Sequence, residues 1–391
     1  MNTLKYLAAV VAMILGAVLT SCDEMNGFIV TFDSNGGSIV SRQIVRVGES
    51  VIEPKEPTRN GYIFIAWYKD VELMNEWKFN FEVLISDVTL YAKWQAIDPL
   101  FKINGLSIDN YPRVDGSTSA EPLNIIIACK LLDIGYKWTT NQFVATWGVE
   151  PKLKDNLKKL EKFRELIKSS QTHQSFINLI DNETDLILSA RKMSSDEKKY
   201  ADAAGVSLIE TPIALDALVF IVNPKNPISS LTIQQVQDIY TGKTTIWKDV
   251  GGYYDEKINP YIRNANSGSQ ELMESLVMKD LDIVEFPETP EIIYTMMGAY
   301  DIVSADERAI CFTIYYYKEM ILRTTGTKDI GIDGIFPNKE SLGNKSYPYT
   351  AEVYAVIRSD LNKSSMAYKL YELLQSENGK RIIAESGYIP N

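Results

Sequence analysis

The chain has very little histidine and cysteine. A single histidine, His173, occurs in 391 residues, which argues against histidine-based catalysis and against a histidine-rich metal site. The three cysteines, Cys22, Cys129 and Cys311, have none of the close spacings that zinc sites use. Neither a Walker phosphate-binding loop nor a dinucleotide-binding fingerprint is present. We therefore expect neither a metal nor a cofactor.

Positively charged residues are fewer than negatively charged ones. Lysine and arginine number 40 against 51 aspartates and glutamates, which leaves a formal net charge of −11. Nucleic acids are bound mainly through Lys and Arg on phosphates, so we expect no nucleic-acid partner. Apolar residues make up 45% of the chain and aromatic residues 10%, which is enough for packed cores. The length suits two or three domains.

The only long apolar run lies at the N-terminus, where Lys5 precedes the stretch 7–19. The run is short for a membrane-spanning helix and is typical of a signal peptide. The following Leu19-Thr20-Ser21-Cys22 resembles a bacterial lipobox. This resemblance implies a signal peptide over residues 1–21 and a lipidated Cys22, followed by an acidic spacer over 22–26. An uncleaved anchor or an ordinary secretory peptide is the alternative.

The other two cysteines lie in apolar surroundings. Cys129 is part of NIIIACKLL and Cys311 is part of RAICFTIYY. Such positions are typical of buried thiols, so we predict no disulfide between them. With a lipidated Cys22, the mature protein is expected in the cell envelope, either periplasmic or surface-exposed, and attached to the membrane by its lipid alone.

Residues 27–95 show the pattern of a small β module. FIVTFDSNGGSIV alternates apolar and polar residues around Asn35-Gly36-Gly37, which predicts a tight turn with positive φ. GYIFIAWY and VTLYAKW are further strand-like runs. Trp67, Trp77 and Trp94 are predicted core residues, because the module has few other large side chains.

This module resembles one internalin-type B repeat, of the Listeria–Bacteroides repeat family. The matching pieces are VTFDSNGG, PTRNGYIFIAWY and the closing LYAKW. The resemblance implies a β-grasp-like domain that acts as a spacer or an adhesive unit on bacterial surfaces. Because only one copy is present, we interpret it as a spacer. A linker is predicted over residues 96–107.

Residues 108–391 alternate between strand-like and helix-like segments, which predicts an α/β architecture with helices on mostly parallel sheets. Two capping boxes mark helix starts, Ser194 with Glu197 and Thr232 with Gln235. The size of this module favours two lobes. Strands are expected at 184–190, 206–210, 217–224 and 354–360, and helices at 194–205, 231–243 and 364–387.

Two places in this module repeat one design, in which small hydroxyl residues precede an amphipathic helix. DGSTSAEPL contains Ser117 and Thr118, and Thr118 has capping-box spacing to Glu121. RNANSGSQELM contains Ser267, Gly268 and Ser269. A helix start offers unpaired N–H groups and a partial positive charge, and glycine lets a ligand approach the backbone. Two such starts face to face would hold a small anion.

Arg263 lies four residues ahead of Ser267, the cap of the second helix start. A guanidinium can make a two-pronged, charge-assisted bond to an oxyanion. Each feature alone has an ordinary structural interpretation, as a simple cap or as a surface arginine. Their combination predicts an anion clamp.

The large module resembles the phosphate-binding components of ABC transporters, within the type II periplasmic-binding-protein superfamily. The matching pieces are DGSTSAEPL, TDLILSARKMS, TPIALDALVFIVNP, LTIQQVQDIYTGKTTIWKDVGG, RNANSGSQELM and SENGKRIIAESGYIP. The resemblance implies two α/β lobes joined by two crossing strands, ALVFIVNP and YPYTAEVYAVI, with phosphate between the lobes. It implies phosphate contacts from Ser117, Thr118, Arg263, Ser267, Gly268 and Ser269, with Ser119 as a further candidate.

Other site residues are less clearly indicated. Many relatives carry an aspartate after the strand that here precedes Ser189-Ala190-Arg191, so Arg191 is expected either in the cleft or on the surface. Thr172 and Ser175 are candidates for a third contact loop, in which His173 is interpreted as a polar loop residue. Asp115 is the preferred substitute for the missing acceptor, because Glu121 is expected to act as a cap.

The leading hypothesis is a monomeric, lipid-anchored receptor that passes inorganic phosphate to an ABC transporter permease or an envelope sensor. The first alternative is a surface adhesion protein that uses the repeat and keeps the large module as a scaffold. The second is an enzyme such as a phosphate-ester hydrolase, for which a nucleophile with an activating base is not evident. We therefore predict a binding protein without enzymatic activity.

Overall fold

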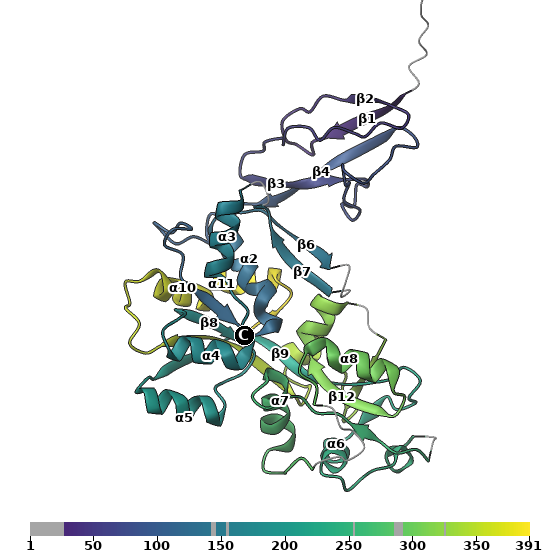
Figure 1. Ribbon diagram of the computed structural model, residues 1–391, viewed down its shortest axis with the longest axis vertical. Coiled ribbons are helices and arrows are strands. Elements are labelled where there is room, and N and C mark those ends of the chain that lie inside the picture. Colours follow the sequence, from purple (N-terminus) through teal and green to yellow (C-terminus); the bar gives the residue numbers. More distant parts are fainter. Residues whose placement is uncertain (1–26, 142–145, 154–155, 253–254, 285–291, 324–325) are drawn as a thin grey trace, which may run out of the picture. The chain divides into compact units, whose positions relative to one another are not determined.

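The computed structural model describes residues 27–141, 146–153, 156–252, 255–284, 292–323 and 326–391 (Figure 1). The predicted signal peptide, the predicted spacer and the predicted lipidation site Cys22 lie outside the described residues. The chain divides into two compact units, Met1–Ile97 and Asp98–Asn391, here called the repeat unit and the binding unit. Among the described helices, none has both the length and the apolarity needed to cross a bilayer.

The repeat unit is a four-stranded sheet with the strand order β2-β1-β4-β3. β1 pairs with β2 antiparallel and with β4 parallel. The predicted turn is present, because Asn35 and Gly36 have φ values of 48° and 82°. The strands are β1 Gly27–Asp33, β2 Gln43–Arg46, β3 Tyr62–Tyr68 and β4 Val88–Ala96.

Aromatic side chains form the core of the repeat unit, as the sequence predicts. Trp67 and Trp77 are buried, and Trp67 packs edge-on against Phe32. Trp94 is only half-buried, and its indole N–H donates to the Ser34 carbonyl at 2.9 Å. The prediction of core tryptophans is therefore confirmed for two residues, and the third covers the turn.

Two long strands, β9 Leu208–Val222 and β14 Thr350–Arg358, run antiparallel through the middle of the binding unit. We call the residues between them the second lobe and the remainder of the binding unit the first lobe. These strands confirm the predicted pair of crossing strands (Figure 1). Residues 206–210 and 217–224 were expected to form separate strands, but β9 is continuous. β14 pairs with its first part, from Leu208 to Ala217, and β12 and β13 pair with the remainder as far as Val222.

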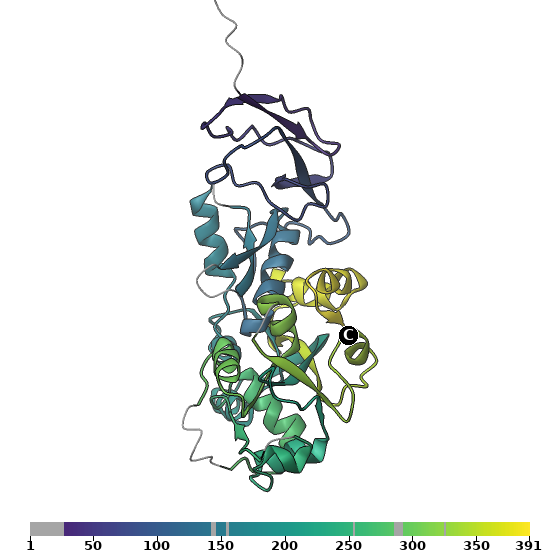
Figure 2. The same cartoon turned by 90° about the vertical axis from the view of Figure 1, so that its right-hand side faces the viewer.

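The first lobe carries the C-terminal helices, which are yellow in Figure 2. α11 packs on β9 and on α2. The elements of this lobe are β5 Val114–Gly116, α2 Glu121–Leu131, β6 Tyr136–Asn141, β7 Thr146–Pro151, α3 Leu157–Leu166, α4 Thr172–Ile180, β8 Leu186–Ser189, α5 Ser195–Ala204, α10 Met366–Gln375, α11 Glu377–Glu385 and β15 Ile389–Pro390.

The second lobe is built on β12 and β13, which both pair antiparallel with β9. Because β9 and β14 pair antiparallel with each of their neighbours, the sheet is mixed rather than mostly parallel as predicted. The elements of this lobe are β10 Ser230–Leu231, α6 Ile233–Tyr240, β11 Asn259–Pro260, α7 Gly268–Leu272, α8 Met296–Ala305, β12 Ala309–Ile314, β13 Lys328–Ile332 and α9 Lys339–Gly343.

Local capping signals were a good guide to the helix starts. The capping boxes at Ser194 and Thr232 are both formed, with side chains bonded in each direction. The prediction of a capping box between Thr118 and Glu121 is wrong, because these two residues do not form one. A short 3₁₀ turn, Thr118–Ala120, comes first, and α2 begins at Glu121 without a side-chain cap.

The core of the binding unit begins earlier in the chain than the sequence suggests. Phe101, within the predicted linker 96–107, is fully buried in this core. Cys129 and Cys311 are also fully buried, and both are free thiols. This confirms the prediction that the two cysteines are buried and do not form a disulfide. Burial raises the pKa of Cys311 to about 12, so this thiol stays protonated and unreactive near neutral pH.

Candidate functional site

The first lobe presents hydroxyl groups at the end of β5. Ser117 follows the strand directly, and its Oγ accepts a hydrogen bond from the Ala190 backbone N–H at 2.9 Å. The same Oγ lies 2.8 Å from Oγ1 of Thr172. Thr172 is the first residue of α4, so these contacts bring two helix starts of this lobe together. Their hydroxyls can donate to an anion.

The second lobe presents Arg263, whose side chain is only 5% exposed. Its Nε donates to the Ile293 carbonyl at 2.9 Å, and its Nη1 donates to Oγ of Ser269 at 3.2 Å. Burial lowers the pKa of its guanidinium. Within the described part of the chain, Arg263 forms no ion pair with a carboxylate. A buried cation without a counter-ion is costly, so this position favours an anion.

The loop of residues 264–267 leads from Arg263 into α7. Oγ of Ser267 accepts from the Gln270 backbone N–H at 3.3 Å, which confirms the predicted cap. The side chain of Gln270 does not complete a capping box. Its Oε1 instead accepts from the backbone N–H of Arg263 at 3.0 Å, which holds the arginine to the helix start.

These groups line one pocket with a volume of about 460 Å³ between the lobes. It contains Ser117, Thr118 and Ser119 from one side and Arg263, Ser267, Gly268 and Ser269 from the other, together with Thr172 and His173. Among the described lining residues there is no aspartate or glutamate. The pocket thus combines hydroxyl and amide donors with one buried cation, which is the chemistry of an oxyanion site.

The lobes approach closely at Gly268. A Cβ placed on this glycine would lie 2.8 Å from Oγ1 of Thr172 in the first lobe. That separation is shorter than an ordinary contact between nonbonded atoms. Glycine is therefore needed here for the helix start of α7 to reach the opposite lobe.

Comparison with known proteins agrees with this geometry. The model of the PBP superfamily domain matches residues 148–377, which is more than half of the chain. The chain belongs to the PBP superfamily. The Listeria-Bacteroides repeat domain matches residues 28–93, so the N-terminal repeat is also confirmed.

The names of several relatives of this PBP superfamily protein refer to phosphate binding or phosphate transport. The phosphate-binding protein PstS of Staphylococcus epidermidis is 26% identical over 225 residues, which cover 56% of this chain and 67% of that protein. PstS of Borreliella burgdorferi is 25% identical over 185 residues, covering 46% and 65%. A substrate-binding protein assigned to phosphate ABC transport in Clostridium perfringens, solved with bound phosphate, is 23% identical with a TM-score of 0.50. This likeness covers 71% of this chain and 98% of that one, and it shows the two-lobed fold.

Other relatives share only a short stretch. A protein of Evansella cellulosilytica is 38% identical over 102 residues, which are 25% of this chain and 15% of that protein. A second protein of this organism is 43% identical over 72 residues, or 8% of its length. The chain therefore spans a small fraction of these two relatives.

Arg191 lies between the lobes, but outside the lining of the pocket that contains Arg263. It is 4% exposed, so it is not on the surface, and it is absent from the lining of the pocket. Its Nη1 and Nη2 donate to the two carboxylate oxygens of Glu197 at 2.7 and 2.8 Å. In this PBP superfamily protein Arg191 is thus part of a buried ion pair beside the pocket.

Asp115 and Ser175 are also held by the protein itself. Oδ1 of Asp115 accepts from the backbone N–H groups of Gly116 and Ser170, and Oδ2 accepts from the Asn178 amide. The structure does not bring this carboxylate to the pocket lining. Oγ of Ser175 donates to the Thr172 carbonyl within α4 at 2.8 Å, so it too faces away from the pocket lining.

Sequence reasoning missed one wall of the pocket, which is the start of α8. Thr295 caps this helix by accepting from the Gly298 backbone N–H at 3.0 Å. A threonine ahead of an apolar run is a recognisable N-cap signal, and it would have found this start. The remaining lining residues are Gln171, Gln174, Ala190, Asn264, Ala265, Asn266, Tyr294, Met296, Met297, Ile314 and Tyr317.

Proposed function

We propose that this protein is a lipid-anchored substrate-binding protein that captures inorganic phosphate, or a similar tetrahedral oxyanion, in the pocket between its lobes. It delivers the anion to an ABC transporter permease or to an envelope sensor. The repeat unit acts as a spacer between the membrane and the binding unit. The protein binds its ligand without transforming it and works as a monomer.

The observation that carries this proposal is the environment of Arg263. Its guanidinium is buried and lacks a carboxylate partner in the described structure, while Ser269 holds it toward the pocket. Hydroxyls and helix starts of both lobes surround the same space. A bound oxyanion would neutralise the charge of Arg263 and accept hydrogen bonds from the hydroxyl and backbone N–H groups that line the pocket. The phosphate named in the relatives fits this requirement.

Selectivity between phosphate and sulfate depends on an acceptor for the proton that phosphate carries. A buried carboxylate would reject sulfate, because the two would repel without a hydrogen bond. The oxygens of Asp115 already accept protein N–H groups, and the described lining holds no carboxylate. We therefore expect hydroxyl oxygens to serve as acceptors and sulfate to compete with phosphate.

Calorimetric titration of the phosphate-free protein tests the function. We expect phosphate to bind with a stoichiometry of one, and sulfate to displace it from the same site. Absence of binding by phosphate under these conditions would contradict the proposed function. Binding of phosphate without competition from sulfate would retain the function and reject the expected lack of selectivity.

The lipid anchor is tested at Cys22. We expect wild-type protein to begin at a lipid-modified Cys22 and to sediment with membranes, because the lipobox-like stretch directs both cleavage and acylation. The variant Cys22→Ser should fold and bind phosphate but remain in the soluble fraction. Intact-mass analysis and membrane fractionation measure both properties. Wild-type protein that retains residues 1–21 and carries no lipid would overturn this proposal.

A further inference from the structure

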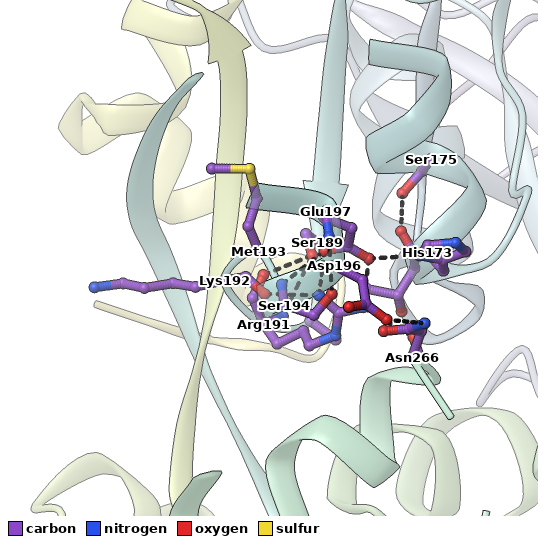
Figure 3. A network of polar contacts seen from close by, with 12 residues as sticks. His173, Ser175, Ser189, Arg191, Lys192, Met193, Ser194, Asp196, Glu197 and Asn266 are labelled. Atoms are coloured by element: carbon purple, nitrogen blue, oxygen red, sulfur yellow. Dashed lines mark hydrogen bonds and ion pairs between the residues drawn. The ribbon is translucent and has the colours of Figure 1, made fainter. Parts of the chain in front are cut away.

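Arg191 connects the two lobes through a polar network beside the pocket. Figure 3 shows its guanidinium between the side chain of Glu197 and the backbone of Asn266. Glu197 belongs to the first lobe and Asn266 to the second. Arg191 is buried, and Glu197 is completely buried, so water does not screen their interaction.

The first lobe fixes the orientation of Arg191. Both carboxylate oxygens of Glu197 receive a guanidinium N–H, and one of them also accepts the Ser194 backbone N–H as part of the capping box of α5. The other oxygen lies 2.9 Å from Nδ1 of His173. The Lys192 carbonyl accepts a further bond from Nη1 at 2.7 Å. A guanidinium held at several points presents the second N–H of Nη2 in one direction.

This second N–H of Nη2 reaches the second lobe. Nη2 of Arg191 donates to the Asn266 carbonyl at 2.8 Å. Asn266 has a φ of 62° and directly precedes Ser267, the cap of α7. The hydrogen bond therefore holds the loop of residues 264–267 from the opposite lobe. Since its two partners belong to different lobes, the bond is present only when the lobes are together.

We propose that Arg191 is a closure latch, a positioning residue that keeps the lobes together around the anion without touching it. This inference rests on the proposed function for its ligand. Arg263 supplies charge to the anion from the second lobe, while Arg191 holds the loop over it from the first. Loss of the latch raises the rate at which phosphate leaves and changes the rate of capture little, because capture starts from separated lobes.

The substitution Arg191→Lys tests the latch. An ammonium group keeps a positive charge beside Glu197, but it cannot hold both carboxylate oxygens and also reach the Asn266 carbonyl. We expect release of radiolabelled inorganic phosphate, measured after dilution into unlabelled phosphate, to become about tenfold faster or more. The association rate should stay within about twofold. If Arg191 only stabilised the fold, Arg191→Lys would lower the free energy of unfolding without making phosphate release faster at an unchanged association rate.

Arg358→Lys is the matched control. The guanidinium of Arg358 also binds a carboxylate, that of Asp360, and a backbone carbonyl, that of Ile180, but both partners belong to the first lobe and lie outside the pocket lining. We expect its release rate to stay within about twofold of wild type. An unchanged release rate in Arg191→Lys, in a protein that binds phosphate, would overturn the latch and leave the proposed function intact.

A second measurement is independent of phosphate. Spin labels at Asp202→Cys in α5 and Lys243→Cys beyond α6 report the distance between the lobes in the full chain with Cys22→Ser. Both positions are exposed, and the buried Cys129 and Cys311 stay unlabelled. Without ligand, Arg191→Lys should shift the distances toward longer values relative to wild type. Identical distributions would overturn the latch even if the wild-type protein bound no phosphate.

Discussion

Replacement of Arg263 by alanine is expected to abolish most of the affinity for phosphate. The guanidinium is buried in the pocket and lacks a carboxylate partner among the described residues, so a bound anion would depend on it for charge and for a charge-assisted hydrogen bond. Removing one partner of such a desolvated charge pair costs roughly 2–5 kcal/mol. The loss corresponds to a weakening of binding by about 30-fold to several thousand-fold.

Thermal unfolding with and without phosphate measures this effect. Ligand at about one hundred times the dissociation constant raises wild-type stability by roughly 2.7 kcal/mol, and Arg263→Ala should lose most of that gain. Arg263→Lys should fall between the two, because lysine keeps the charge but not the planar fork. Equal phosphate-induced shifts in wild type and Arg263→Ala would remove Arg263 from the site.

Arg164→Ala is the appropriate control for this experiment, because Arg164 is exposed on α3. Arg323, although it belongs to no sequence motif, is less suitable. Its guanidinium lies 3.9 Å from the ring centre of Trp147 and 5.0 Å from that of Trp138. Stacking of this kind contributes to stability. A change at Arg323 would therefore mix packing with binding, whereas Arg164→Ala should retain the full phosphate-induced shift.

Gly268→Ala is expected to weaken phosphate binding nearly as strongly. The added methyl group would lie 2.8 Å from Oγ1 of Thr172, and that oxygen is fixed by its contact with Ser117. The lobes must then stay apart, or the helix start must shift, at a cost of roughly 1–3 kcal/mol. Because separated lobes can accommodate the methyl group, unfolding without phosphate should change little.

Titration calorimetry of the two glycine variants Gly268→Ala and Gly148→Ala separates this effect from a general one. Gly148 lies in β7, and a Cβ at that position would meet no atom within 4 Å. Gly148→Ala should therefore bind phosphate like wild type. If Gly268→Ala also bound phosphate with unchanged affinity, close approach of α7 to the first lobe would not be part of binding.

The sequence alone was sufficient for features that depend on neighbouring residues. The Asn35-Gly36 turn and the capping boxes at Ser194 and Thr232 formed as predicted, because each involves backbone and side chains within one turn of chain. The two crossing strands were implied by the resemblance of the large module to a known family. The small residues at Ser117 and Ser267 were found from their place ahead of amphipathic helices, and the fold brings them to one pocket.

Only the tertiary structure decided where the charged side chains point. Asp115 was a reasonable acceptor in the sequence, yet Ser170 and Asn178, 55 and 63 positions away, take up its oxygens. Arg191 was expected in the cleft or on the surface, but Glu197 binds it and the Asn266 carbonyl, 75 positions away, receives an N–H of its Nη2. A buried charge takes whichever partners the fold brings within hydrogen-bond reach. Those partners are set by strand pairing and helix packing over long separations, which local patterns do not encode.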